Sequence, residues 1–94
     1  MHGEYKMPGG KLVVADLEVR DGRLSQVQVS GDFFLEPESA LEWIDNALNG
    51  QPADSDEQAL AAHLKAALGE RVSMYGISET AVARAVQRAL GHTP

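Results

Sequence analysis

The first third of the chain alternates between apolar and polar side chains, which is the pattern of a half-buried β-strand. Over residues 11–20 the apolar positions of one face are Val13, Ala15, Leu17 and Val19. The dipeptide Asp21-Gly22 is typical of a tight hairpin turn. Residues 23–30 then alternate again, so the pattern predicts a β-hairpin.

The returning strand has one irregularity. Val27 and Val29 share a face, but Leu24 falls on the opposite parity, which predicts a β-bulge just after the turn. Gly31 follows the strand, and residues 33–35 are expected to form a short third strand of the same sheet. One face of this sheet is expected to pack under helices. The other face is polar and is expected to be either solvated or covered by a partner.

Beyond residue 36, apolar side chains recur every three or four positions, which predicts amphipathic helices. The predicted helices cover about residues 37–49, 56–68 and 79–90. Ser55 and Gln58 form a capping box at the start of the second helix, and Ser78 is expected to cap the third. Strands followed by helices indicate an α+β fold, in which an N-terminal antiparallel three-stranded sheet packs against about three helices. Residues 1–94 are expected to form a single domain.

Composition excludes several classes of function. The chain has 94 residues, no cysteine and a formal net charge of −6, with a sequence pI near 4.8. The lack of cysteine excludes disulfides, thiolate chemistry and cysteine-ligated metal clusters. The acidic charge disfavours binding to nucleic acid. No apolar run reaches the roughly 18 residues that a membrane helix needs, so a cytoplasmic protein without membrane contact is expected.

A paired glycine between two lysines is the first candidate for chemistry. Gly9 and Gly10 allow backbone N–H groups to approach an anion closely, and Lys6 and Lys11 could neutralise phosphate charge. The segment is not a P-loop, because the spacing of that motif is absent and the segment leads into a strand. A flexible lead-in to the strand is the alternative interpretation.

Aromatic side chains are the second candidate. Phe33 and Phe34 are adjacent on an extended segment, so they should point to opposite faces. One of them is expected in the core, and the other is a candidate anchor for a partner beside Asp32. Trp43 and Tyr75 have the same two interpretations, and core packing is favoured for Trp43.

The remaining polar residues suggest no catalytic group. Glu38 and Glu42 lie four positions apart and share a helix face, which is most simply a solvated face. His2, His63 and His92 lack the spacing of metal ligands, so no metal site is predicted. The chain contains no self-contained catalytic constellation.

Two blocks of sequence carry a family resemblance. Residues 5–12 read Tyr-Lys-Met-Pro-Gly-Gly-Lys-Leu, and residues 30–37 read Ser-Gly-Asp-Phe-Phe-Leu-Glu-Pro. In this order and separation they resemble the C-terminal accessory domain of lipoate–protein ligases. The similarity is strongest over residues 5–50 and extends over nearly the whole chain. It implies a fold like that of the scaffold and sulfur-acceptor proteins of iron–sulfur cluster assembly, whose cysteines this chain lacks.

The resemblance also implies a function. The chain would be a separately encoded, non-catalytic accessory subunit that forms a heterodimer with the catalytic subunit and binds no cofactor alone. That partner would bind ATP, Mg²⁺ and lipoate, form lipoyl-adenylate, and transfer the lipoyl group to a lysine of lipoyl-carrier proteins. The residues expected near the adenylate phosphates are Lys6, Gly9, Gly10 and Lys11. The residues expected at the interface with the catalytic subunit are Tyr5, Asp32, Phe33 and Phe34.

Two other functions remain open from the sequence. The chain could be an interaction module whose partner is unaffected in its adenylation step. It could also be a small anion-binding protein that uses the loop at Gly9, Gly10 and Lys11 alone. Binding of ATP or pyrophosphate by the isolated chain would distinguish this last function from the other two.

Overall fold

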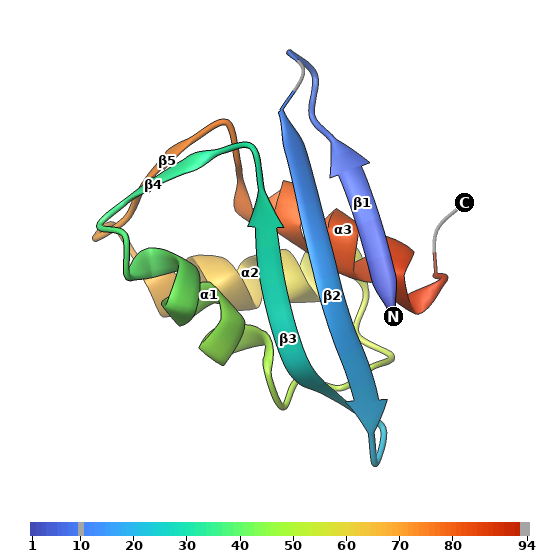
Figure 1. Cartoon of the computed structure of the whole chain (residues 1–94). Coiled ribbons are helices and arrows are strands. Elements are labelled where there is room, and N and C mark those ends of the chain that lie inside the picture. Colours follow the sequence, from blue (N-terminus) through green and yellow to red (C-terminus); the bar gives the residue numbers. More distant parts are fainter. Residues whose placement is uncertain (10, 93–94) are drawn as a thin grey trace.

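The computed structural model describes residues 1–9 and 11–92, which form five strands and three helices (Figure 1). The elements in chain order are β1 (His2–Lys6), β2 (Leu12–Arg20), β3 (Arg23–Gly31), β4 (Phe34–Glu36), α1 (Ala40–Leu48), α2 (Glu57–Leu68), β5 (Ser73–Tyr75) and α3 (Glu79–Leu90).

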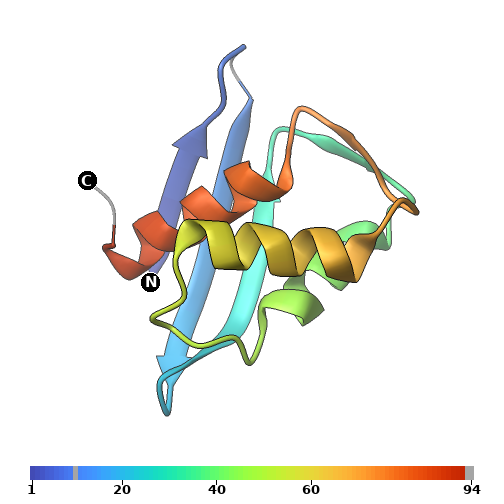
Figure 2. The same ribbon diagram turned by 180° about the vertical axis from the view of Figure 1, so that it is seen from behind.

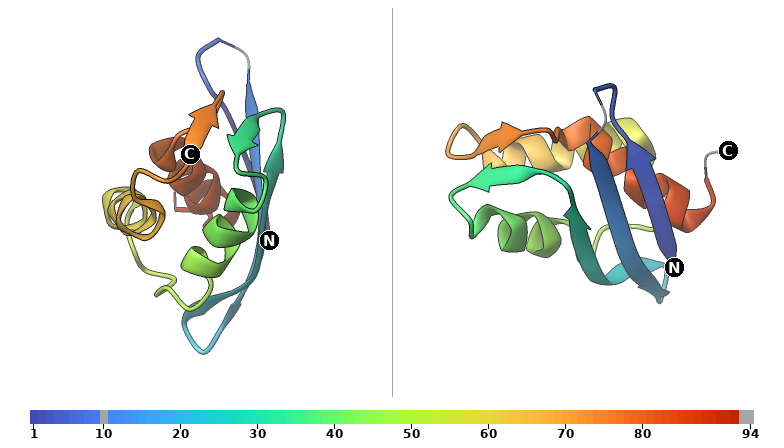
Figure 3. Two further views of the ribbon diagram at one scale, coloured as in Figure 1. Left: turned by 90° about the vertical axis from the view of Figure 1, so that its left-hand side faces the viewer. Right: turned by 45° about the horizontal axis from the view of Figure 1, so that its top comes forward.

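The strands β1, β2 and β3 form an antiparallel sheet in that spatial order. Helix α3 packs against β1 and β2, α1 packs against β3, and α2 lies on α1 and α3. Figure 2 shows α2 and α3 in front of the sheet, and the left view of Figure 3 shows the helices gathered on one side of it. The predicted α+β fold, with a three-stranded antiparallel sheet and three helices, is therefore confirmed.

The third strand of the sheet is not the predicted one. Residues 34–36 do form a strand, β4, but it pairs with β5 in a separate two-stranded ribbon. The third position in the main sheet belongs to β1, whose helix-facing side chains are only Gly3 and Tyr5. A strand of five residues with a glycine on its inner face has almost no apolar alternation, which is why the pattern missed it.

The predicted β-bulge is present between β2 and β3. Asp16 of β2 pairs with Gln28 of β3. Two residues further along β2, Glu18 pairs with Ser25, so β3 contains one extra residue in between. Gln26 adopts a positive φ of 51° at this point. The bulge changes the parity of β3, so that all three of its buried apolar side chains face the helices.

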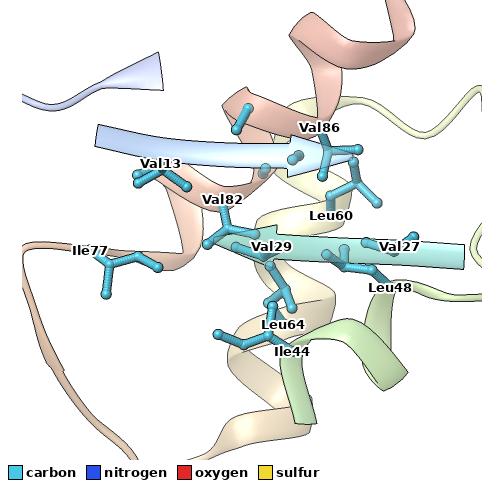
Figure 4. Close-up of a cluster of buried hydrophobic side chains, with 14 of the residues drawn as sticks. Val13, Val27, Val29, Ile44, Leu48, Leu60, Leu64, Ile77, Val82 and Val86 are labelled. Carbon is cyan, nitrogen blue, oxygen red and sulfur yellow. The ribbon is translucent and has the colours of Figure 1, made fainter. Parts of the chain in front are cut away.

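The core lies between the sheet and the helices, and Figure 4 shows a cluster of its aliphatic side chains. The largest fully buried side chains are Ile44, Leu48, Leu60, Leu64, Leu68, Val13, Val82 and Val86. Trp43 is partly buried at the margin of this core, where the Arg71 guanidinium stacks 4.5 Å from the centre of its ring. Val19, predicted to share the inner face of β2, is 38% exposed because it lies near the hairpin turn.

Two of the helix starts differ from the predicted ones. Helix α1 begins at Ala40, later than expected. The residue that caps α2 is Asp56 instead of Ser55, because an Asp56 carboxylate oxygen accepts a hydrogen bond of 2.7 Å from the Ala59 N–H. The predicted cap of α3 is confirmed, since the Ser78 hydroxyl accepts a hydrogen bond from a backbone N–H in the first turn.

The outer edge of β3 is hydrogen-bonded to side chains of α1 and the residue that follows it. The Val29 N–H donates to an Asp45 carboxylate oxygen at 2.9 Å, and the Val27 N–H donates to the Asn49 side-chain oxygen at 3.0 Å. Burial raises the pKa of the Asp45 carboxyl, and the bond from Val29 partly offsets that rise. Backbone donors that would otherwise be free for another strand are thus already occupied.

Candidate functional site

A shallow groove lies beside the end of β3, where the chain turns toward β4 and passes close to β5. It has a volume of about 290 Å³. The residues that line it, called here the Lys11 groove, are Lys11, Asp32, Phe33, Phe34, Tyr75 and Gly76. Four of the eight residues assigned from the sequence to the adenylate site or the partner interface therefore lie together: Lys11, Asp32, Phe33 and Phe34.

The turn after β3 depends on a glycine. Gly31 has φ of 150°, and a Cβ at this position would collide with the carbonyl oxygen of Leu12. The next residue is held by a hydrogen bond of 3.0 Å from the Asp32 N–H to the same Leu12 oxygen. This close crossing holds Asp32 beside the start of β2 and so brings it near Lys11.

Lys11 is positioned by a second glycine, Gly76, which follows β5. A Cβ at Gly76 would be 2.8 Å from Cγ of Lys11, so the alkyl stem of the lysine lies directly over this glycine. The stem is thereby packed while the side chain as a whole remains exposed. Lys11 can present its ammonium group to a ligand or a partner at the groove.

The ribbon of β4 and β5 forms the aromatic wall of the groove. Phe34 pairs with Tyr75 across the ribbon, and their ring centroids are 6.0 Å apart. These side chains are 54% and 55% exposed, and they are two of the four large apolar side chains that are exposed in residues 1–9 and 11–92. Phe33 is partly buried against the core, so the expected division of the two phenylalanines between inside and outside is observed.

A second hollow of about 260 Å³ lies on the other side of the phenylalanines. It is lined by Phe33, Phe34, Leu35, Glu38 and Leu41. Phe34 therefore stands between two depressions, one containing the Lys11 cation and one lined mainly by apolar side chains. An exposed aromatic residue between two hollows can pack closely against a protein surface of complementary shape.

Tyr5 lies away from the groove. Its ring packs beneath two arginines of α3, with the guanidinium carbons of Arg84 and Arg88 at 4.9 and 5.1 Å from its centre. Arg84 also donates to the Tyr5 hydroxyl at 3.2 Å and to the Glu57 carboxylate at 2.8 Å. The hydrogen bond from Arg84 holds the pKa of Glu57 below its usual range. Tyr5 thus joins β1 to α3.

The two lysines of the first sequence block are separated. Lys6 pairs with Leu12 in the ladder between β1 and β2, so its side chain lies on the sheet face opposite the helices. Gly9 lies in the connecting turn with φ of 98° and open space around it. Gly10, the other predicted residue, lies outside the described residues. Of the two lysines, only Lys11 lines the groove.

The open face of the sheet carries a charged cluster that the sequence analysis did not identify. Nδ1 of His2 is 2.6 Å from an Asp16 carboxylate oxygen, and Nε2 is 2.7 Å from a Glu4 oxygen. The hydrogen bond to Glu4 and then that to Asp16 raise the pKa of His2 above 6.5. Within residues 1–9 and 11–92, no group of three histidine or carboxylate side chains has an arrangement that could hold a metal ion.

We expect the His2 imidazole to titrate above pH 6.5, because both ring nitrogens can donate to carboxylates only when the ring is protonated. The contribution of these two hydrogen bonds to the stability of the folded protein is then fully present below pH 6.5. It is lost as the pH rises through the higher pKa that His2 has in the folded state. An NMR titration should show the pKa of His2 lowered more by Glu4→Gln than by Asp16→Asn. Asp54→Asn, a change in an exposed loop, is the control; a His2 pKa at or below 6.5 would contradict this prediction.

Comparison with known proteins gives a match in fold. No protein-family model matches the chain, and no curated protein matches it in sequence. A solved structure of a bipartite lipoate protein ligase and its E2 lipoyl domain from Thermoplasma acidophilum does contain a similar chain. The fold resembles that of a chain from a lipoylation system. The TM-score is 0.70 at 20% sequence identity, and the match covers 92% of this chain and 97% of the other.

No helix in residues 1–9 and 11–92 is long and apolar enough to cross a membrane.

Proposed function

We propose that this chain is the accessory subunit of a two-part lipoate–protein ligase. In this role it binds the catalytic subunit and enables ATP-dependent activation of lipoate to lipoyl-adenylate, before transfer to a lysine of a lipoyl-carrier protein. The observation that carries the proposal is the match in fold to a chain from a bipartite lipoate protein ligase structure, nearly end to end in both chains. The resemblance of the two sequence blocks to the accessory domain of lipoate–protein ligases supports it independently.

The chemistry of adenylation explains what an accessory surface can contribute. A lipoate carboxylate oxygen attacks the α-phosphorus of ATP, an O–P bond forms, and the bond to pyrophosphate breaks with its electron pair leaving on pyrophosphate. Negative charge develops on the phosphate oxygens during this step, and a fixed cation close to them lowers the barrier. Lys11, with its stem packed over Gly76, is the residue proposed for this role. ATP, Mg²⁺ and lipoate would be bound by the catalytic subunit.

Closure of the accessory subunit over the partner would also exclude water from the reacting groups. Lipoyl-adenylate is a mixed anhydride, and water would hydrolyse it without productive transfer. Opening after the first step would then admit the lipoyl-carrier protein. This cycle requires a surface that binds reversibly, and the Lys11 groove, with its exposed aromatic wall and its lysine, is the surface proposed for it.

The test is lipoate-dependent exchange between ATP and pyrophosphate by the catalytic subunit from the same source, with and without this chain. We expect exchange to require both proteins. Full exchange by the catalytic subunit alone, unchanged by this chain, would contradict the proposal. Binding without any effect on exchange would instead indicate an interaction module, and binding of pyrophosphate by the isolated chain in calorimetry would indicate an anion-binding protein.

A further inference from the structure

We infer that the ribbon of β4 and β5 is the docking element for the catalytic subunit, with Phe34 and Tyr75 as its anchors. This inference rests on the proposed function and specifies which surface of the chain meets the partner. Tyr75 belongs to neither sequence block, and it reaches Phe34 only because β5 pairs with β4 in the folded chain. The right-hand view of Figure 3 shows this ribbon running away from the main sheet.

The two faces of the ribbon differ in character. Leu35 is 6% exposed and pairs with the partly buried Met74, so this face attaches the ribbon to the core. Phe34 and Tyr75 are more than half exposed on the opposite face. Two neighbouring aromatic side chains in water form an apolar patch that association with a protein would bury, and aromatic residues are typical anchors of interfaces.

The position of Lys11 favours a partner that carries an anion. Lys11, Phe34 and Tyr75 line the same groove, so a surface that covers the aromatic pair must also meet the lysine. The occupant must therefore combine an apolar rim with an anionic centre. A catalytic subunit holding ATP or lipoyl-adenylate has this combination, because its bound phosphates are the anionic centre. Asp32 lines the groove as well and suits the basic side chains that commonly surround bound phosphates.

The open face of the main sheet is less suited to this contact. Its side chains include His2, which pairs with both Glu4 and Asp16, together with the exposed Glu18 and Gln28. The centres of protein interfaces are depleted of charged residues, since each charge must be desolvated on binding. The aromatic ribbon is therefore the better docking surface of the two.

The test measures binding and adenylation separately. In titration calorimetry with the catalytic subunit, Phe34→Ala and Tyr75→Ala are each expected to weaken binding about tenfold or more, as truncation of an anchor does. Val19→Ala, a change in an exposed apolar residue at the far end of β2, is the matched control and should bind like the unaltered chain. Circular dichroism and melting curves would verify that each variant is folded.

The rate of adenylation then shows whether the ribbon contributes to binding or to the chemical step. At saturating catalytic subunit, the Phe34→Ala chain should regain most of the exchange rate, because only its affinity is reduced. If the unaltered chain supports exchange but a folded double variant with both Phe34→Ala and Tyr75→Ala binds equally well, the docking site is wrong and the proposed function stands. If the unaltered chain neither binds nor supports exchange, the proposed function itself fails. Loss of self-association in the double variant, with binding to the catalytic subunit intact, would assign the ribbon to a second copy of this chain and would also overturn the inference.

Discussion

Replacing Lys11 with methionine is expected to slow lipoate adenylation by about 100- to 1000-fold, the range found when one preorganised charge-stabilising group is removed. Methionine retains an unbranched apolar stem that can lie over Gly76, so the substitution removes the charge and leaves the packing largely intact. The transfer of the lipoyl group from preformed lipoyl-adenylate should proceed at nearly the normal rate, because pyrophosphate has already left. Single-turnover measurements of each half-reaction would give both rates.

The corresponding control is Lys65→Met, the same substitution at an exposed position on α2. Lys6→Met should have a smaller effect than Lys11→Met, because Lys6 lies on the other side of the sheet. Equal slowing of adenylation and transfer by Lys11→Met would contradict a role in charge stabilisation and would indicate a general loss of binding.

Replacing Gly3 with alanine should produce a large loss of stability. Gly3 lies in β1 against α3, where a Cβ would collide with backbone atoms of Ala85 and Ala89 and lie 2.8 Å from Cα of Ala89. Backbone cannot move aside as a flexible side chain can, so the strand must separate from the helix. We expect a loss of about 2 kcal/mol or more, which is typical of overpacking. For a domain of this size that loss lowers the melting temperature by about 8–16 °C.

Gly22→Ala is the control variant, because it tests the effect of backbone conformation without a steric collision. Gly22 has φ of 75° and nothing within 4 Å of an added Cβ, so alanine there introduces conformational strain alone. Its melting temperature should fall by less than that of Gly3→Ala, as measured by thermal unfolding of both variants. A Gly3→Ala chain that melts with the unaltered protein would show that β1 does not pack closely on α3.

The long, regular elements could be predicted from the sequence, and the short pairings could not. The hairpin of β2 and β3 and the helices α2 and α3 have enough apolar positions for their periodicity to be clear. β1 escaped prediction because its inner face consists of Gly3 and Tyr5. The pairing of β4 with β5 joins segments far apart in the chain, and a three-residue strand has no period of its own.

The candidate site could likewise be predicted only in part from the sequence. Lys11 and Phe34 were singled out from the sequence, since a lysine after glycines and a pair of adjacent aromatics are informative by themselves, and they line the same groove. Their neighbours were not, because Tyr75 and Gly76 reach Lys11 only through the path of β5. Tyr5 was assigned to a partner interface from its place in a sequence block, but the two arginines of α3 that cover it lie about eighty positions away.

The capped edge of β3 has a consequence for self-assembly. Asp45 and Asn49 occupy N–H groups that an incoming strand would need at β3, and at the other edge, β1, the Glu4 carbonyl already accepts a hydrogen bond of 2.9 Å from the Arg88 guanidinium. Two copies that paired through their β1 strands would create one continuous sheet with a blocked β3 at each end. Growth of the main sheet would stop at that pair, so the occupied edge of β3 works against open-ended stacking of this sheet.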